Sequence, residues 1–264
     1  MATVNEILKY LQTLAPKEMK MDWDNVGLLC GSGSREVTKI LVALDPFEHV
    51  CREAAEVGAQ LIVTHHPLIF QPLPNVTDET SIGRSVMLLC SHGISAINAH
   101  PNLDCAPGGV NDVLAAKLGL GDVRVINPSG LDENGREWGL LRCGEIPQQP
   151  LEAFLATVKD SLGCEGLRYV SGGKPVRKVA VGGGSCAGGM LEALDANCDT
   201  FVTADVKYNQ FWDAKELGLN LIDAGHFYTE NPVCAYLAEK TQGAFPEIQV
   251  QISKNHADCM KFFA

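Results

Sequence analysis

The chain opens with apolar positions spaced as on one face of a helix. They run from Val4 to Leu11 and follow Thr3-x-x-Glu6, a capping box in which each side chain accepts a hydrogen bond from the backbone amide of the other residue. The pattern predicts a first helix that stops near Leu14.

Beyond this helix, short runs of Ile, Val and Leu alternate with segments of helical spacing. The runs KILVALD (39–45) and AQLIVTHH (59–66) flank a segment that starts at Asp45-Pro46 and ends at Gly58, which predicts a strand, a helix and a second strand. The alternation continues with a helix over Ser85–His92, a strand over 94–100 and a helix over Val110–Leu118. Apolar strands between helices indicate an α/β fold with mainly parallel sheets flanked by helices.

The same order of elements recurs in the second half of the chain. Residues 178–203 match residues 39–64 at an offset of 139 positions (64 to 203), and GLNLIDAGH (218–226) is similar to GISAINAH (93–100). We therefore expect an internal duplication with two related α/β domains, residues 1–124 and residues 125–264, and a C-terminal tail that packs back on the first. Two independent β-α-β units that obey the same packing rules are the alternative.

The start of the second half has a different pattern. Residues 125–177 carry two turn signals, DENG (132–135) and SGGK (171–174). These signals predict hairpins on either side of one helix, Leu151–Leu162.

Composition narrows the class of protein. Hydrophobic residues make up 46% and charged residues 20% of the 264 residues, which is typical of a soluble globular chain. The net charge of −11 has the wrong sign for broad binding to nucleic acid. No apolar run reaches the roughly 20 residues of a membrane span, and the chain start shows no charged leader before an apolar core, so we expect a cytoplasmic protein without a membrane partner. The ten cysteines form no C-x-x-C pair, which disfavours a zinc knuckle.

Polar side chains gather where four of the predicted strands end. In doubly wound sheets the carboxyl ends of strands form the ligand site, so these side chains should converge. The four segments are Thr64-His65-His66-Pro67, His100-Pro-Asn-Leu-Asp104, Thr203-Ala-Asp205 and Asp223-Ala-Gly-His226 through Glu230.

This set has the chemistry of a metal site. His65 and His66 would face opposite ways in a continuing strand, but at a strand end they can fan apart and serve two ions. Asp104 and Glu230 add oxygen ligands and His226 a third imidazole, a mixture suited to two divalent ions of Zn, Fe, Mn or Co. Five ligands for two ions leave open positions, which catalytic sites keep for water and substrate.

A glycine-rich segment allows two interpretations. Gly182, Gly184 and Ala187 fit G-x-G-x-x-A after a strand, with Asp205 about 20 residues on, as in a dinucleotide fingerprint. Short Gly-rich turns are common, however, and Asp205 corresponds to His66 in the repeat. We favour an anion cradle or a tight turn at the wall of the site, with Lys207 and Asp205 as supporting or substrate-contacting residues.

Four motifs resemble those of a known family. Trp23-Asp-Asn-Val-Gly-Leu28, His65-His-Pro-Leu-Ile-Phe70, Asn98-Ala-His-Pro-Asn-Leu-Asp104 and Asp223-Ala-Gly-His226 through Glu230 are similar to the signatures of the Nif-three-like family, the GTP cyclohydrolase 1 type 2 homologs. The chain departs from the family pattern at Pro101, Ala204 and Asn209, on the substrate side.

The resemblance implies a two-domain α/β subunit with a dinuclear metal centre, assembled as a toroidal homohexamer whose metals face an interior cavity. It also implies the metal ligands, which in this chain are His65, His66, Asp104, His226 and Glu230, with His100 beside the centre.

Our leading hypothesis is a metal-dependent hydrolase that acts on a nucleotide or related heterocycle. In a cyclohydrolase the electrophile would be the imidazole-ring carbon of a purine, His100 would be the catalytic proton shuttle, and Lys207 with residues 182–189 could hold phosphates. A dinuclear phosphoesterase would use the same centre. The rival from another class is a non-catalytic metal-binding or partner-binding hexamer.

Overall fold

The computed structural model describes residues 1–21 and 23–263, and the chain divides into two compact units. The first unit comprises Met1–Leu103 and Val233–Ala257, and the second comprises Asp104–Pro232 together with residues 258–263. The ranges expected from the sequence, 1–124 and 125–264, group two segments differently. Residues 104–124 pack on the second sheet, whereas residues 233–257 supply a helix and a strand to the first unit.

The first unit is built on a five-stranded sheet in the order β1-β4-β3-β2-β13. Its members are β1 (Gly27–Cys30), β2 (Lys39–Ala43), β3 (Leu61–Thr64), β4 (Ser95–Asn98) and β13 (Gln249–Ile252). β13, β2, β3 and β4 run parallel, and β1 is antiparallel to β4. The strand at one edge of this sheet therefore comes from the C-terminal part of the chain.

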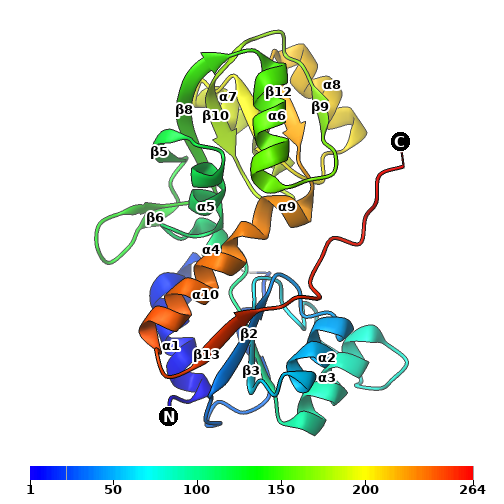
Figure 1. Cartoon of the computed structure of the whole chain (residues 1–264). Helices are drawn as coiled ribbons and strands as arrows, with labels where there is room; N and C mark the ends of the chain where they lie inside the picture. Colours follow the sequence, from blue (N-terminus) through cyan, green and yellow to red (C-terminus); the bar gives the residue numbers. More distant parts are fainter. Residues whose placement is uncertain (22, 264) are drawn as a thin grey trace. The chain divides into compact units, whose positions relative to one another are not determined.

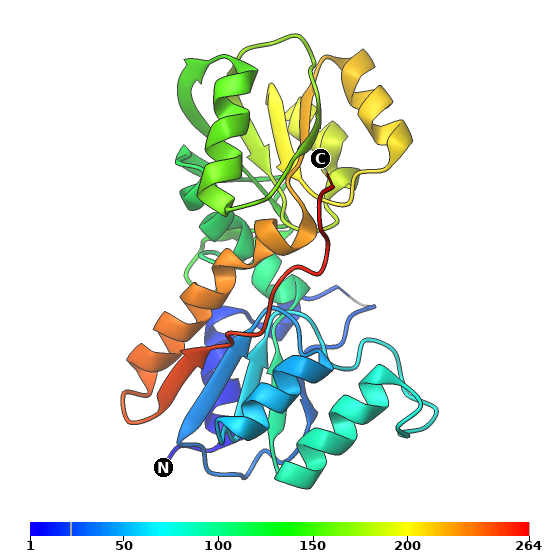
Figure 2. The same ribbon diagram turned by 45° about the vertical axis from the view of Figure 1, so that its right-hand side comes forward.

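Helices cover both faces of the first sheet (Figures 1 and 2). α2 (Glu48–Glu56) and α3 (Ser81–His92) pack on one face around a core that includes Val50, Ala54 and Leu89. α1 (Val4–Leu14) and α10 (Pro232–Ala244) cover the other face. A short 3₁₀ helix, η1 (Lys17–Met19), follows α1 in the chain. The capping box of α1 is confirmed, with Glu6 N donating to Thr3 Oγ1 and Thr3 N to Glu6 Oε2.

The second unit contains a six-stranded sheet in the order β5-β8-β10-β11-β12-β9. Its members are β5 (Gly121–Ile126), β8 (Leu141–Gln149), β9 (Arg168–Val170), β10 (Val176–Val181), β11 (Thr200–Thr203) and β12 (Asn220–Asp223). β10, β11 and β12 run parallel to one another. β8 pairs antiparallel with β10 and β5, and β9 pairs antiparallel with β12. The α/β class with flanking helices is confirmed, and the second sheet is mixed rather than mainly parallel.

Two layers of helices enclose this second sheet. α5 (Val110–Lys117) and α6 (Leu151–Leu162) cover one face, where Phe154 and Val158 pack against the strands. η2 (Ala187–Gly189), α7 (Met190–Asp195) and α8 (Tyr208–Leu217) lie on the other face around Phe201. α4 (Pro101–Cys105) and α9 (His226–Glu230) are short helices that follow β4 and β12.

The two predicted hairpins have different outcomes. The DENG turn joins β6 (Gly130–Leu131) to β7 (Glu137–Trp138), which pair antiparallel as predicted. The hairpin predicted at SGGK is wrong, since β9 pairs with β12 while β10 pairs with β8 and β11. A tight turn fixes a local reversal of the chain but leaves the choice of strand partner to packing.

The central strands of the two units follow the same order. β2, β3 and β4 are consecutive in the first sheet, as β10, β11 and β12 are in the second. Ala99 N donates to Thr64 O after β4, and Ala224 N donates to Thr203 O after β12. This similarity between the units is consistent with an internal duplication, which stays a prediction. Within the described residues, no helix is both long and apolar enough to cross a membrane.

Candidate metal centre

Three imidazoles meet in the first unit, beyond the carboxyl ends of β3 and β4. His65 and His66 follow β3 directly, and His100 follows β4 by two residues. One ring nitrogen of each lies within 4.8 Å of those of the others. His65 is fully buried, while His66 and His100 are partly exposed. The structure therefore brings together the three histidines that the sequence placed at strand ends of the first domain.

Each of these rings is held through its Nδ1 atom. Nδ1 of His65 lies 2.8 Å from the carbonyl oxygen of Ala99, and Nδ1 of His66 lies 2.7 Å from Oδ1 of Asp45. Nδ1 of His100 lies 3.0 Å from Oδ1 of Asp24. A carbonyl or an ionised carboxylate only accepts, so Nδ1 carries the hydrogen and Nε2 is the nitrogen with a lone pair to offer.

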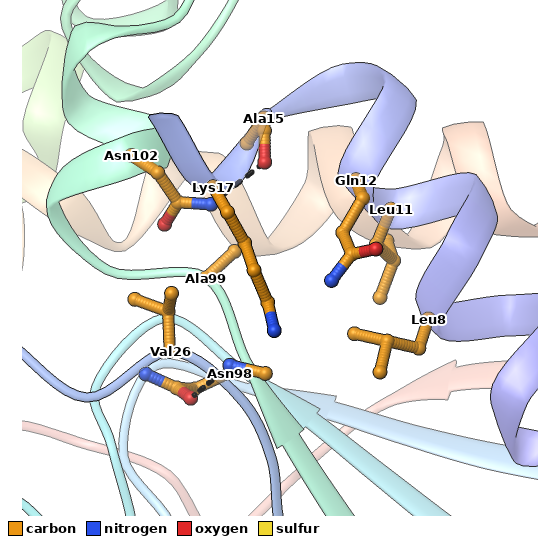
Figure 3. Close-up of a pocket in the computed structure, with 10 residues that line it drawn as sticks. Leu8, Leu11, Gln12, Ala15, Lys17, Val26, Asn98, Ala99 and Asn102 are labelled. Carbon is orange, nitrogen blue, oxygen red and sulfur yellow. Dashed lines mark hydrogen bonds between the residues drawn. The ribbon is translucent and has the colours of Figure 1, made fainter. Parts of the chain in front are cut away.

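Two asparagines anchor the chain segment that carries His100. Asn98 Oδ1 accepts from Gly27 N at 3.1 Å, and Asn102 Nδ2 donates to Ala15 O at 2.7 Å. Figure 3 shows these two bonds at a small cavity between α1 and the ends of β1 and β4, which is lined by both apolar side chains and the polar side chains of Gln12 and Lys17. Because both asparagines are buried, the segment that carries His100 is tied to β1 and α1.

The second unit contains buried oxygen donors of its own. Asp104 and Glu230 are buried, and each offers a carboxylate oxygen within 4.8 Å of the other. His226 and Glu230 lie one turn apart on α9, with Nε2 of His226 3.0 Å from Oε2 of Glu230. His226 repeats the arrangement of the first unit, since its Nδ1 lies 2.8 Å from Oδ2 of Asp205.

A buried arginine secures the segment that follows Asp104. The Arg142 guanidinium on β8 donates to the carbonyl oxygens of Cys105 and Ala106 and forms a bidentate pair with Asp112 at 2.9 and 3.0 Å. Arg142 is only 1% exposed. These bonds fix the C-terminal end of α4 against the second sheet, and with it the backbone of Asp104.

The glycine-rich turn after β10 makes room for the Glu230 carboxylate. A Cβ atom placed on Gly184 would lie 2.1 Å from Oε1 of Glu230 and 3.1 Å from Nε2 of His226. Gly184 also has a φ of +62°, in the left-handed region that favours glycine. A side chain at this position is thus excluded by both space and backbone conformation.

The backbone amides of this turn are engaged within the protein. Gly182 N donates to Val202 O, Gly183 N to Asn111 Oδ1 and Gly184 N to Thr229 Oγ1. A phosphate cradle would need such amides aimed at the ligand, so these bonds favour the tight turn. Lys207 is exposed, and its backbone caps α8.

Electrostatics in the second unit suit a cation. Burial raises the pKa of Asp205, but hydrogen bonds from Ser185 and His226 outweigh it and leave the pKa below its usual value. Burial also raises the pKa of Cys186 well above its usual value, and the negative charges of Asp104 and Glu230 raise it further. Two buried carboxylates this close repel each other unless a positive charge lies with them.

The donor set fits divalent transition metals. Imidazole nitrogen suits Zn, Fe and Co, and carboxylate oxygen suits harder ions such as Mn. Metal-binding histidines almost always donate their second N–H to a carboxylate, a carbonyl or water. His65, His66, His100 and His226 all show that pattern.

Sequence analysis missed two of the three carboxylates that orient these rings. Asp24 and Asp45 were quoted within motifs without a role at the site, whereas Asp205 was expected to be a supporting or substrate-contacting residue. A usable signal was present, because Asp45 and Asp205 stand at or near strand ends beside the histidines they contact.

Solved structures share this fold over the whole chain. The Bacillus cereus protein related to NIF3 superimposes with a TM-score of 0.93 at 25% identity, covering 100% of this chain and 99% of that one.

Relatives by sequence point to the same group. A Clostridium perfringens protein named GTP cyclohydrolase 1 type 2 homolog is 35% identical over 262 residues, 98% of this chain and 99% of its own. A Helicobacter pylori protein named GTP cyclohydrolase 1 type 2 is 35% identical over 239 residues, 90% of this chain and 91% of its own. Residues 2–258 match the family profile of Duf34/NIF3 (NGG1p interacting factor 3), and the chain belongs to this family.

Proposed function

We propose that the donors of the two units together hold one dinuclear metal centre, and that the protein is a metal-dependent hydrolase. The observation that carries this proposal is the common orientation of four histidines, each of which has Nδ1 held by a carbonyl or carboxylate oxygen, as in metal-binding histidines. The stability of the fold does not by itself require four histidine rings with the same hydrogen-bonding pattern.

The local chain connectivity supports a shared centre. α4 begins directly after His100 and contains Asp104, so imidazole and carboxylate donors come from one short segment. Asp104 and Glu230 can each bridge two ions through two oxygens, whereas a neutral imidazole offers one lone pair. We assign His65, His66, Asp104, His226 and Glu230 as ligands of two divalent ions.

The chemistry of hydrolysis divides between the ions and the protein. Divalent ions, when bound, acidify water and polarise the group under attack. His100 is the proton shuttle in this proposal, because Asp24 fixes the proton on Nδ1 and leaves Nε2 to accept one. The Asp24 side chain is fully buried, which keeps the orientation of the ring constant.

The names of the relatives support one class of substrate. The Helicobacter pylori relative carries the name of a GTP cyclohydrolase, and the same name with the word homolog recurs among the other relatives. We therefore propose a nucleotide or related heterocycle as substrate. The homohexamer and the cytoplasmic location stay predictions from the family resemblance.

Metal stoichiometry tests the centre. Wild-type protein should hold two divalent ions per chain, His65→Ala or His66→Ala should weaken mainly one, and Ala at the bridging carboxylate, Asp104 or Glu230, should weaken both. The carboxylate variant also loses the negative charge that offsets repulsion between the cations. Elemental analysis of folded protein with the same oligomeric state as wild type reports these numbers.

The matched control is His92→Ala, which removes an exposed histidine of α3 and should leave both ions. A wild type that saturates at one ion, or a protein that holds two ions without either carboxylate, would overturn the dinuclear centre.

Turnover tests the hydrolase. Metal-loaded protein should hydrolyse GTP or another nucleotide, and His65→Ala should abolish that activity. Generic phosphoesters in the same screen separate a phosphoesterase from a cyclohydrolase. Two bound ions with no turnover of any of these substrates would favour a non-catalytic metal-binding role.

A further inference from the structure

A second cavity opens in the first unit directly beside His66. It has a volume of about 130 Å³ and lies between the start of α2, the segment after β3 and the start of α3. Both Asp45 and His66 line it. The orienting carboxylate and a proposed metal ligand therefore form one end of the cavity.

The rest of the lining is apolar apart from the hydroxyl groups of Ser81 and Ser85, and three of its large apolar side chains are exposed. Phe47, Phe70 and Ile82 line the cavity, with exposed fractions of 55%, 41% and 40%. Exposed large apolar side chains that surround one hollow mark a binding site more often than chance surface positions. Two of the three are aromatic, and aromatic rings bind flat partners by stacking or edge contacts.

The polar groups restrict the ligand further. Of the described residues that line the cavity, none is a lysine or an arginine, and one is the carboxylate of Asp45. Oδ1 of Asp45 accepts from His66, and a carboxylate has a second oxygen that can accept further hydrogen bonds. A phosphate would meet repulsion here, whereas an N–H donor of a neutral ring would find an acceptor.

From this lining we infer that the cavity is a slot for a planar heterocycle bearing N–H donors, which packs against Phe47 and Phe70 and donates to Asp45. The slot takes the ring of a substrate and leaves any phosphate outside. This inference deepens the proposed function, because it specifies which part of a nucleotide lies next to the proposed metal ligand His66.

Binding of an uncharged nucleoside to metal-free protein tests the slot without requiring catalysis. Full-length protein stripped with a chelator should bind guanosine saturably in calorimetry or equilibrium dialysis. Phe47→Ala should weaken binding roughly ten-fold, the usual loss when a stacking aromatic is removed. Ile82→Trp should abolish binding, since the indole fills the slot.

Two comparisons assign the contact. Purine riboside, whose ring has no N–H donor, should bind several-fold more weakly than guanosine, and inorganic triphosphate should not compete. Tyr208→Ala removes an aromatic of α8 that is 79% exposed in the second unit, and it should leave guanosine binding unchanged.

The outcomes separate the slot from the hydrolase. Absence of saturable guanosine binding, or binding unchanged by both Phe47→Ala and Ile82→Trp, overturns the slot. The protein could bind guanosine in a way that depends on Phe47 and Ile82 and yet show no turnover when loaded with metal. That result would support the slot and contradict the proposed hydrolase activity. Turnover that Phe47→Ala and Ile82→Trp leave unchanged would keep the hydrolase and overturn the slot.

Discussion

The two units use the same order of central strands but place different chemistry at the strand ends. At the offset of 139 positions, Asp45 of the first unit corresponds to Gly184 of the second, and His66 corresponds to Asp205. In the first unit the carboxylate of Asp45 orients the imidazole of His66. In the second, Asp205 takes the orienting role for His226, and Gly184 leaves space for Glu230.

This difference shows how one scaffold can supply two kinds of ligand. The first unit offers neutral nitrogen donors, and the second adds two buried carboxylates. A centre built from the first unit alone would place two cations among neutral ligands. In the proposed centre, carboxylates from the second unit would supply the negative charge that offsets repulsion between two cations.

The largest expected effect is the loss of stability when a glycine with positive φ is replaced by alanine, which should differ between the two units. Gly184→Ala should destabilise the second unit by roughly 2–4 kcal/mol, because its Cβ would overlap Glu230 in a left-handed backbone. Gly58→Ala in the first unit has a similar φ of +69° but nothing within 4 Å of the new Cβ, so it should cost only about 1 kcal/mol. Urea unfolding measures both. Equal losses would show that Glu230 yields freely, and that Gly184 serves the turn alone.

The next effect tests the orienting carboxylates of each unit. Asp205→Asn and Asp45→Asn should each lower metal affinity about 10-fold to 100-fold, the usual result of altering a ligand's hydrogen-bond partner. Asp205 has a φ of +52°, which asparagine also adopts, so its backbone should not change. Competition with a chelating dye measures the affinities. A loss confined to Asp45→Asn would limit the orienting mechanism to the first unit.

The smallest effect concerns acid stability of the first unit. Burial alone would raise the pKa of Glu53 on α2, but hydrogen bonds from Lys254 N, Ser253 Oγ and Asn255 N lower it below the ordinary value of 4.5. A lowered folded pKa means that this stabilisation is fully present above pH 4.5 and is lost as the pH falls through the folded value.

Hydrogen exchange checks this acid effect. Amides of β13, which directly precedes Ser253, should lose protection on acidification, whereas those of β11 in the second unit should not lose it from this cause. Glu53→Gln should remove the pH dependence and cost about 1 kcal/mol at neutral pH. The same pH dependence in the variant would assign it to another group.

Local patterns predicted the central elements well. The helix Leu151–Leu162 and the strand–helix–strand order around residues 39–64 follow from spacing and capping residues that act within one element. β13 was missed because QVQI has no continuous apolar run, and only its pairing with β2 makes it a strand. The SGGK segment likewise predicted a reversal of the chain correctly, but the strands on either side of it do not pair with each other, because strand pairing depends on packing.

The candidate site also combines residues that local patterns reveal with contacts that depend on the tertiary structure. Histidines and carboxylates at strand ends can be found from the sequence, because the fold class alone says that strand ends converge. The partnership of Asp24 with His100 joins positions 76 residues apart. The steric role of Gly184 depends equally on where Glu230 points. Neither depends on local spacing, so the sequence of a single chain contains no local signal for them.

The C-terminal strand also bears on how the protein is made. The ribosome completes the main segment of the second unit at Pro232, but the first unit still lacks Gln249–Ile252, which pair with β2. Domains generally fold as units during synthesis, the N-terminal one first. In this protein the later-encoded unit can finish first, and the nascent first unit keeps an open edge at β2 until residues 249–252 have emerged. An unpaired strand edge invites association with other chains, so this interval is the one in which a chaperone would have most to protect.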